Sequence, residues 1–388
     1  MRYIEEFRRQ DLARTLASRI AREAQPDRTY HLMEFCGGHT HAIFRYGVQD
    51  FMPKNVTFVH GPGCPVCVLP VRRLDDAVEL AERHGVILCT YGDMMRVPGS
   101  KRRSLIRAKA DGADIRMVYS TQDALTLARK NPDRQVVFFA IGFETTTPPT
   151  AVALKQADAE GLENFSIFSN HVLTPAAIAH ILVSPDYAAG AVKIDGFLGP
   201  SHVSSVIGSR PYEAAAKTFR KPVVIAGFEP LDVMQASLML IRQINEGRAE
   251  VENQYTRVVT RDGNRKAQDL VDDVFELRPS FEWRGLGSVP LSALSIRSRY
   301  AHLDAERRFA LSDKASREVK SCECPSILRG VKKPPDCKLF GTVCTPDNPM
   351  GSCMVSSEGA CAAYWSYGRF RAPAGTANGA RETTEVAE

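Results

Sequence analysis

Most of the cysteines in this 388-residue chain lie in motifs or clusters that could bind a metal or carry electrons. Cys36 opens the motif Cys-Gly-Gly-His-Thr-His, in which His39 and His41 could bring imidazole groups to the thiol. The motif Gly-Pro-Gly-Cys-Pro-Val-Cys places Cys64 and Cys67 in a turn. Thiolate and imidazole together suit iron or zinc, and a Cys-x-x-Cys pair can chelate a metal or close a disulfide. We expect His39 and His41 to lower the pKa of the Cys36 thiol or to accept its proton.

The second group lies near the C-terminus, in a stretch interrupted by prolines. Its six members are Cys322, Cys324, Cys337, Cys344, Cys353 and Cys361. A 4Fe–4S cluster held by four thiolates fits this pattern better than zinc, because tightly spaced Cys-x2-Cys pairs are missing; zinc is the alternative. Spacing does not decide which four bind, and we favour Cys324, Cys337, Cys344 and Cys361 over Cys322 and Cys353. Cys361 is expected in the first turn of a helix, where the helix dipole favours a thiolate.

The N-terminal thiol motifs follow predicted strands, and helical patterns separate several of these strands. Alternation of this kind predicts parallel sheets covered by helices on both faces. Cys89 lies inside an apolar strand and is expected to be a buried structural cysteine. The predicted strands are Tyr30–Phe35, Val56–His60, Gly85–Thr90, Asp114–Ser120, Gln135–Ile141, Phe165–Ser169, Lys193–Leu198 and Pro222–Ala226.

The predicted fold class is therefore α/β, with two doubly wound parallel-sheet domains around a cleft and a small irregular C-terminal iron–sulfur domain. The thiol motifs should face the cleft, because ligands of such sheets bind beyond the carboxyl ends of the strands. The predicted divisions are an N-terminal helix (1–24), an α/β domain carrying both N-terminal thiol motifs (25–130), a second α/β domain (131–280), the 4Fe–4S domain (281–370) and a disordered tail (371–388).

Composition excludes several classes of protein. Hydrophobic residues make up 44% of the chain and charged residues 24%, as in ordinary globular proteins. The net charge of +5 is too small to predict nucleic-acid binding. No apolar stretch approaches the ~18–20 residues that span a membrane. The N-terminal MRYIEEFRRQ is charged where a signal peptide would be apolar, so we expect a cytoplasmic protein.

Several segments together resemble the HypD family of NiFe-hydrogenase maturation proteins. The resemblance covers about residues 30–367 in order, so no single motif carries it. The matching segments are CGGHTHAI (36–43), GPGCPVC (61–67), GFETTTPPTA (142–151), GPSHVS (199–204) and CTPDNPMGSCMVSSEGACAAY (344–364).

The resemblance implies a scaffold, rather than a conventional turnover enzyme, on which the Fe(CN)2CO group of the hydrogenase active site is assembled. The implied partners are a HypC-type chaperone, a HypE-type cyanide donor and, indirectly, the hydrogenase large subunit. A 4Fe–4S cluster is implied in the C-terminal region. Carried over by motif, Cys36 becomes the principal iron ligand, and Cys64 and Cys67 become further iron ligands or a redox pair. His39, His202 and Glu358 are further candidates for the site.

Two other functions are alternatives to this one. A cluster-dependent thiol–disulfide reductase acting on a protein substrate would explain the Cys-x-x-Cys pair and the cluster, but would leave the Cys-Gly-Gly-His-Thr-His motif without a role. A nucleotide-dependent enzyme is the weakest alternative, because neither a P-loop motif nor a Gly-x-Gly-x-x-Gly fingerprint occurs in the sequence.

Overall fold

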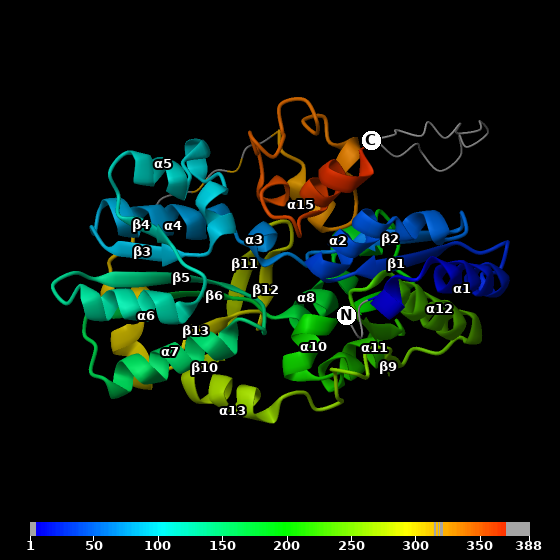
Figure 1. The fold of residues 1–388 in the computed structure, drawn as a ribbon, viewed down its shortest axis with the longest axis horizontal. Coiled ribbons are helices and arrows are strands. Elements are labelled where there is room, and N and C mark those ends of the chain that lie inside the picture. The colour runs from blue at the N-terminus through cyan, green and yellow to red at the C-terminus, as the bar shows by residue number, and fades with distance from the viewer. Residues whose placement is uncertain (1–4, 314–315, 317, 319–320, 370–388) are drawn as a thin grey trace, which may run out of the picture.

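The computed structural model describes residues 5–313, 316, 318 and 321–369, and its two larger sheets are both parallel (Figure 1). The five-stranded sheet has the order β2-β1-β7-β8-β9. Its strands are β2 (Val56–His60), β1 (Tyr30–Glu34), β7 (Gly196–Pro200), β8 (Val223–Ala226) and β9 (Val251–Asn253). Strands β1 and β2 pair in the register Tyr30↔Val56 to Glu34↔His60, so both end at the same edge of the sheet.

The four-stranded sheet has the order β4-β3-β5-β6. Its strands are β4 (Ile115–Met117), β3 (Ile87–Thr90), β5 (Val136–Gly142) and β6 (Phe165–His171). Every residue of β5 is buried, which explains its continuous apolar sequence, because a central parallel strand is covered on both faces. Cys89 on β3 is fully buried, as expected of a structural cysteine.

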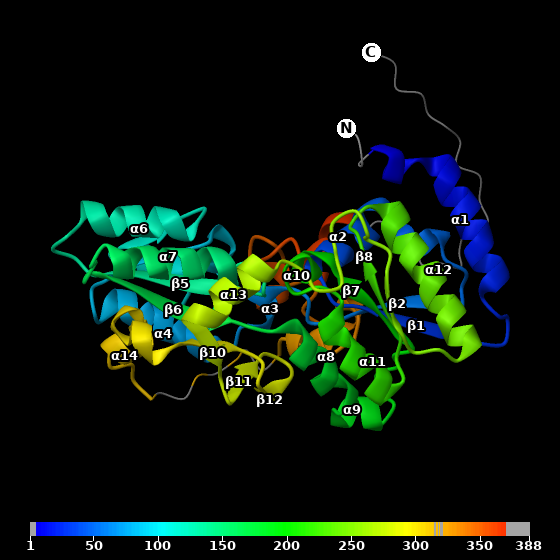
Figure 2. The same ribbon diagram turned by 90° about the horizontal axis from the view of Figure 1, so that it is seen from below.

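Helices cover both faces of each sheet (Figures 1 and 2). On the five-stranded sheet, α1 (Gln10–Glu23), α2 (Gly37–Tyr46) and α12 (Pro230–Glu246) pack on one face, and α8 (Thr174–Leu182) and α11 (Glu213–Phe219) on the other. On the four-stranded sheet, α4 (Val71–Glu82) and α5 (Leu105–Ala110) lie opposite α6 (Thr121–Lys130) and α7 (Thr147–Ala159). No helix in the described part of the chain has the length and apolar character needed to cross a membrane.

Smaller elements join these layers. Two antiparallel hairpins are formed by β10 (Phe275–Leu277) with β13 (Leu294–Ile296), and by β11 (Ser280–Trp283) with β12 (Gly287–Pro290). The remaining α-helices are α3 (Pro65–Val68), α9 (Pro185–Ala188), α10 (Ser201–Ile207), α13 (Arg265–Val274), α14 (Ala305–Arg308), α15 (Cys324–Leu328) and α16 (Ala360–Ala363). The irregular C-terminal segment, orange in Figure 1, lies over the junction between the two sheets.

All eight predicted strands are present, but the chain is shared between the sheets differently from the predicted boundary at residue 130. The five-stranded sheet takes strands from residues 30–60 and 196–253, and the four-stranded sheet takes residues 87–171. The chain thus leaves the first sheet and returns to it. Sequence order alone does not reveal this, because β1 pairs with β7 across more than a hundred residues.

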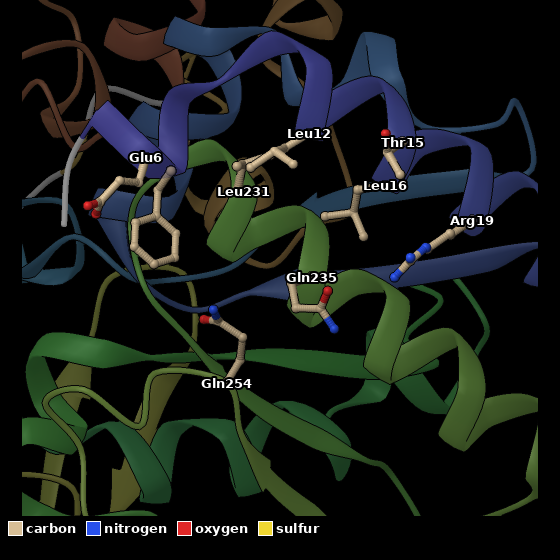
Figure 3. Close-up of a pocket in the computed structure, with 9 residues that line it drawn as sticks. Glu6, Leu12, Thr15, Leu16, Arg19, Leu231, Gln235 and Gln254 are labelled. Carbon is tan, nitrogen blue, oxygen red and sulfur yellow. The ribbon is translucent and has the colours of Figure 1, made fainter.

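The N-terminal helix also differs from its prediction. A short 3-10 segment, Glu5–Arg8, is separated from α1 by the extended backbone of Arg9. Leu16 and Ile20 are buried as expected, but Leu12 is 42% exposed and lines a cavity of about 420 Å³ between α1 and α12 (Figure 3). The first residues of the predicted helix and the predicted tail at 371–388 lie outside the described residues.

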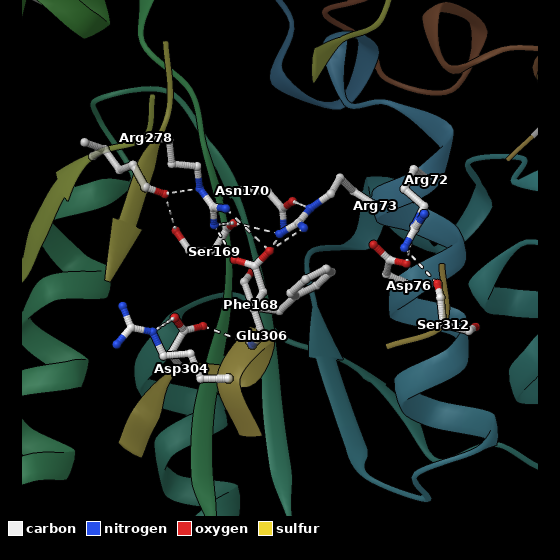
Figure 4. A network of polar contacts seen from close by, with 12 residues as sticks. Arg72, Arg73, Asp76, Phe168, Ser169, Asn170, Arg278, Asp304, Glu306 and Ser312 are labelled. Carbon is white, nitrogen blue, oxygen red and sulfur yellow. Dashed lines mark hydrogen bonds and ion pairs between the residues drawn. The ribbon is translucent and has the colours of Figure 1, made fainter. Parts of the chain in front are cut away.

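A half-buried ionic network ties α4 to the four-stranded sheet (Figure 4). Arg73 on α4 pairs with Glu306 at 2.5 Å, donates to the carbonyl of Ser169 and lies 4.1 Å from the centre of the Phe168 ring. Arg278 reaches the second oxygen of Glu306. The network therefore fixes the helix that follows the Cys-x-x-Cys turn.

Replacing Arg73 tests how much this network stabilises the fold. We expect Arg73→Met to lower the free energy of unfolding by roughly 2 kcal/mol, because it removes one of the two cations that compensate the half-buried Glu306 carboxylate. Arg83→Met, which removes an exposed pair with Glu79 on the same helix, should cost below about 0.5 kcal/mol. Denaturant unfolding of both variants measures the difference, and equal losses would contradict it.

Candidate functional site

The two N-terminal thiol motifs meet at the carboxyl ends of β1 and β2. The N–H of Gly37 donates to the carbonyl of Gly63 at 2.9 Å. Gly63 has to be glycine, because any side chain there would collide with the backbone of Cys36. Cys36 therefore touches the residue that precedes Cys64, and the motifs form one loop cluster.

Cys64 and Cys67 form a disulfide with a Cα–Cα distance of 5.2 Å. Both are buried, with 3% and 0% exposure. The disulfide lies against Ser352 of the C-terminal segment: the Cys67 sulfur is 3.9 Å from the Ser352 carbonyl oxygen, and the Ser352 hydroxyl donates to the carbonyl of Cys67 at 3.0 Å. The disulfide thus contacts the segment that holds the C-terminal cysteines.

Cys324 is at the centre of the C-terminal cysteines. Its pKa lies well below the ordinary value, because the thiols of Cys322 and Cys353 donate hydrogen bonds to it, joined by Ser352, whose oxygen is 3.6 Å away. Electrostatic influence from Cys324 also reaches Cys344 and Cys361. Five of the six cysteines are buried, and Cys322 is half-buried.

These residues fit an iron–sulfur cluster by donor type and by convergence, since thiols meet here without histidine among them. The thiols of Cys322 and Cys353 each reach the thiol of Cys324. Within residues 5–369, apart from the five undescribed positions, no three His, Cys, Asp or Glu side chains surround a point where a single ion could bind. Cysteine thiolates without histidine are the usual ligands of a 4Fe–4S cluster, and a zinc site with four cysteines is the alternative for the same donor set.

Cys361 differs in part from its prediction. It does lie in the first turn of α16, but its pKa is raised well above the ordinary value. Burial is the largest cause, followed by the neighbouring Cys324, Cys344 and Cys337. The dipole of such a short helix stabilises the Cys361 thiolate by less than desolvation destabilises it. The expected thiolate is therefore not favoured without a bound cation.

Cys36 is buried at the N-terminus of α2, and its pKa is raised. Burial is the largest cause, and the carboxylates of Glu358 and Glu34 add to it, while the N–H groups of Gly38 and His39 act in the opposite direction. The structure thus differs from the expectation that His39 and His41 lower this pKa. The ring of His39 is held elsewhere, and the ring of His41 packs 5.2 Å from that of Tyr367.

His39 is fully buried and held by main-chain oxygens. Its Nε2 lies 2.9 Å from the Ala226 carbonyl and 3.1 Å from that of Gly227. Carbonyls only accept hydrogen bonds, so Nε2 carries the proton. Burial lowers the pKa of His39, so the ring is neutral, and its Nδ1 lone pair has no partner among the described residues. Such a lone pair can accept a proton or a hydrogen bond.

The other two predicted site residues lie on either side of this loop cluster. Glu358 packs against Gly37, where any side chain would collide with it, and burial raises its pKa. His202 opens α10 at the surface, with its ring 4.1 Å from that of Phe228. Phe228 in turn lies 5.1 Å from the His39 ring. The structure therefore brings Cys36, His39, His202, Glu358 and the disulfide to one end of the five-stranded sheet.

Glu34 is a site residue that the sequence analysis missed. It is fully buried two residues before Cys36 and accepts hydrogen bonds from the Cys36 N–H at 3.1 Å, from the Thr40 hydroxyl and from the His60 ring at 2.8 Å. Its signal in the sequence was a single acid in an otherwise apolar strand. Such a residue is buried only when its oxygens are satisfied, and here they organise the Cys36 loop.

The two carboxylates near Cys36 should control its reactivity. Removing either negative charge lowers the thiol pKa, because a like charge disfavours the thiolate. We expect Glu358→Gln to speed alkylation of Cys36 by iodoacetamide at pH 8, and Glu34→Gln to speed it less. Asp76→Asn, which alters a buried acid on α4 paired with Arg72, is the control. Peptide mass spectrometry follows Cys36 alone, and unchanged rates in both Glu variants would refute the electrostatic account.

The family model described as HypD, hydrogenase formation hypA family, matches residues 11–368. The chain is 67% identical over 372 residues to the hydrogenase maturation factor HypD of Rhizobium leguminosarum bv. viciae, covering 96% of this chain and 97% of the relative. It is 65% identical over 371 residues to HypD of Azotobacter vinelandii, covering 96% and 98%. It is 46% identical over 372 residues to HypD of Escherichia coli, covering 95% and 98%. The chain belongs to the HypD family of hydrogenase maturation factors.

Proposed function

We propose that this protein is the scaffold on which the Fe(CN)2CO group of a NiFe hydrogenase is assembled, with Cys36 as the principal iron ligand. The observation that carries the proposal is the convergence of Cys36, the Cys64–Cys67 disulfide and the C-terminal cysteines. Iron bearing cyanide and CO favours soft thiolate ligands. Membership in the HypD family supports a maturation role for such a site.

The environment of Cys36 favours loading by a cation. Burial and two carboxylates hold the thiol protonated, which protects it from oxidation, because the thiolate is the reactive form. An arriving iron replaces the thiol proton, and its positive charge is balanced by Glu34 and Glu358. The released proton leaves to the solvent, because burial lowers the pKa of the His39 ring and the carbonyls of Ala226 and Gly227 hold that ring. The sulfur then binds iron where backbone and ring atoms leave little room for water.

The Cys64–Cys67 pair contributes electrons. Opening the disulfide takes two electrons and two protons and yields two thiols; closing it returns them. Cys324, Cys337, Cys344 and Cys361 are proposed to hold a 4Fe–4S cluster, with Cys322 and Cys353 in reserve. Such a cluster, when bound, supplies single electrons at low potential.

The proposed partners follow from the family. A HypC-type chaperone would deliver or receive the iron group at Cys36, and a HypE-type protein would donate cyanide. His202, exposed on α10, lies where such a partner could approach. The hydrogenase large subunit would be reached indirectly. We also propose that the protein works in the cytoplasm, without contact to nucleic acid.

The alternative function, a thiol–disulfide reductase for a protein substrate, is less well supported. Exchange with a protein disulfide requires direct attack by an accessible thiolate. Cys64 and Cys67 are 3% and 0% exposed, and Ser352 lies against the pair. A substrate disulfide could reach them only after the C-terminal segment moved away, which favours an internal redox role.

Cys36→Ala tests the central proposal. Protein purified without oxygen, together with its chaperone, should lose the infrared bands of CO and CN and should no longer support hydrogenase activity. Cys89→Ala removes a buried thiol from the other sheet and should retain both. If the Cys36→Ala protein retained the CO and CN bands at normal abundance, the proposal would be refuted.

Cys324→Ala tests the cluster separately. We expect a brown protein with about four irons per chain to lose its colour and most of its iron, because Cys324 is the thiol on which the others converge. Cys89→Ala again serves as the control. Iron analysis and visible absorbance give the result, and stoichiometric zinc without iron in the unmutated protein would show that the cluster assignment is wrong.

A further inference from the structure

Three arginines surround a small surface pocket that the proposed function does not use. Arg96, Arg102 and Arg107 line a cavity of about 280 Å³ together with Asp347, Asn348 and Pro349. Arg96 donates to the carbonyl of Pro346, and Arg102 donates to the side chain of Asn348. Across the described part of the chain, none of the three guanidinium groups forms an ion pair with a carboxylate, and Asp347 is the one acid that lines the pocket. Three arginines and one aspartate leave the pocket with a net positive charge.

This arginine pocket lies directly on the cysteine-rich segment. Its C-terminal wall, residues 346–349, belongs to the loop between Cys344 and Cys353. Ser352, a few residues further along, touches both the Cys67 sulfur and the Cys324 thiol. The disulfide itself is buried, so a protein that supplies electrons cannot touch it. The surface of the cysteine-rich segment is the place where such a protein would bind.

The pocket also has the mixed character of a transient protein interface. Ile106 lines it and is 49% exposed, and Val343, the neighbour of Cys344, is equally exposed. Small interfaces that combine a charged rim with a few apolar residues suit short-lived complexes, and complementary charge speeds their formation. Nucleic acid is a poorer occupant, because no aromatic side chain lines the pocket for base stacking.

We propose that Arg96, Arg102 and Arg107 form the docking site for an acidic protein that carries single electrons and reduces the Cys64–Cys67 pair. The inference rests on the proposed redox role of that pair. Electrons and protons balance in this reduction. Each of two reduced carriers gives up one electron, two protons come from water, and one disulfide becomes two thiols. An iron–sulfur carrier at about −400 mV is reducing enough for a protein disulfide.

The test uses the full-length protein purified without oxygen and reduced plant-type [2Fe–2S] ferredoxin, an acidic one-electron carrier, as the probe. Thiols formed at Cys64 and Cys67 are counted by alkylation and mass spectrometry. We expect the double variant Arg96→Glu, Arg107→Glu to react at least about tenfold more slowly than the unmutated protein at low salt, and raising the salt should narrow this difference. The double variant Arg14→Glu, Arg22→Glu carries the same charge change on the exposed face of α1 and should react within about twofold of the unmutated protein.

Two further measurements separate the possible outcomes. Dithiothreitol should reduce the disulfide equally in all three proteins, which shows that the pair itself is intact. Equal ferredoxin rates in the two double variants would overturn the docking site, whatever Cys36→Ala does to the CO and CN bands. Loss of binding to inorganic phosphate or to short DNA in the Arg96/Arg107 variant, with an unchanged ferredoxin rate, would identify a phosphate site instead and would also overturn the proposal.

Discussion

The parallel pairing of β1 with β2 is the constraint on which the site depends. Because parallel strands end at the same edge of a sheet, the loops that follow Glu34 and His60 must meet there. The hydrogen bond from Gly37 to Gly63 then brings the two loops into contact. A register slip of one residue would turn Glu34 away from Cys36 and His60, and would remove the buried acceptor on which the loop rests.

The electrostatic environment next to this contact is unfavourable for the thiolate of Cys36. Two carboxylates and burial disfavour the thiolate of Cys36, although a thiolate is what a metal would require. This environment suits the proposed role of Cys36 as the ligand of an iron group that is loaded and later released. Without that group the sulfur stays protonated and inert; with the group bound, the same carboxylates would be favourable neighbours.

The C-terminal segment depends on the two sheets as much as on its own cysteines. It contains little regular structure, and Ser352 anchors it to the main chain of Cys67. The turn of the β11–β12 hairpin supports the same region, because the N–H and side chain of Arg284 donate to the carbonyls of Val68 and Leu69. The disulfide turn is thus held between a hairpin and the cysteine-rich segment, which explains why it is buried.

The sequence by itself determined the local structure and the chemistry. It predicted the eight strands, the buried Cys89 and the three thiol motifs, because these depend on apolar period, glycine content and residue type. The tertiary structure decided which residues lie next to one another. The return of the chain to the five-stranded sheet, the disulfide against Ser352, the raised pKa of Cys36 and the role of Glu34 all come from residues far apart in sequence or from burial. Spacing along a chain reports which groups are present, whereas pairing, desolvation and charge at a site are set only when distant segments pack together.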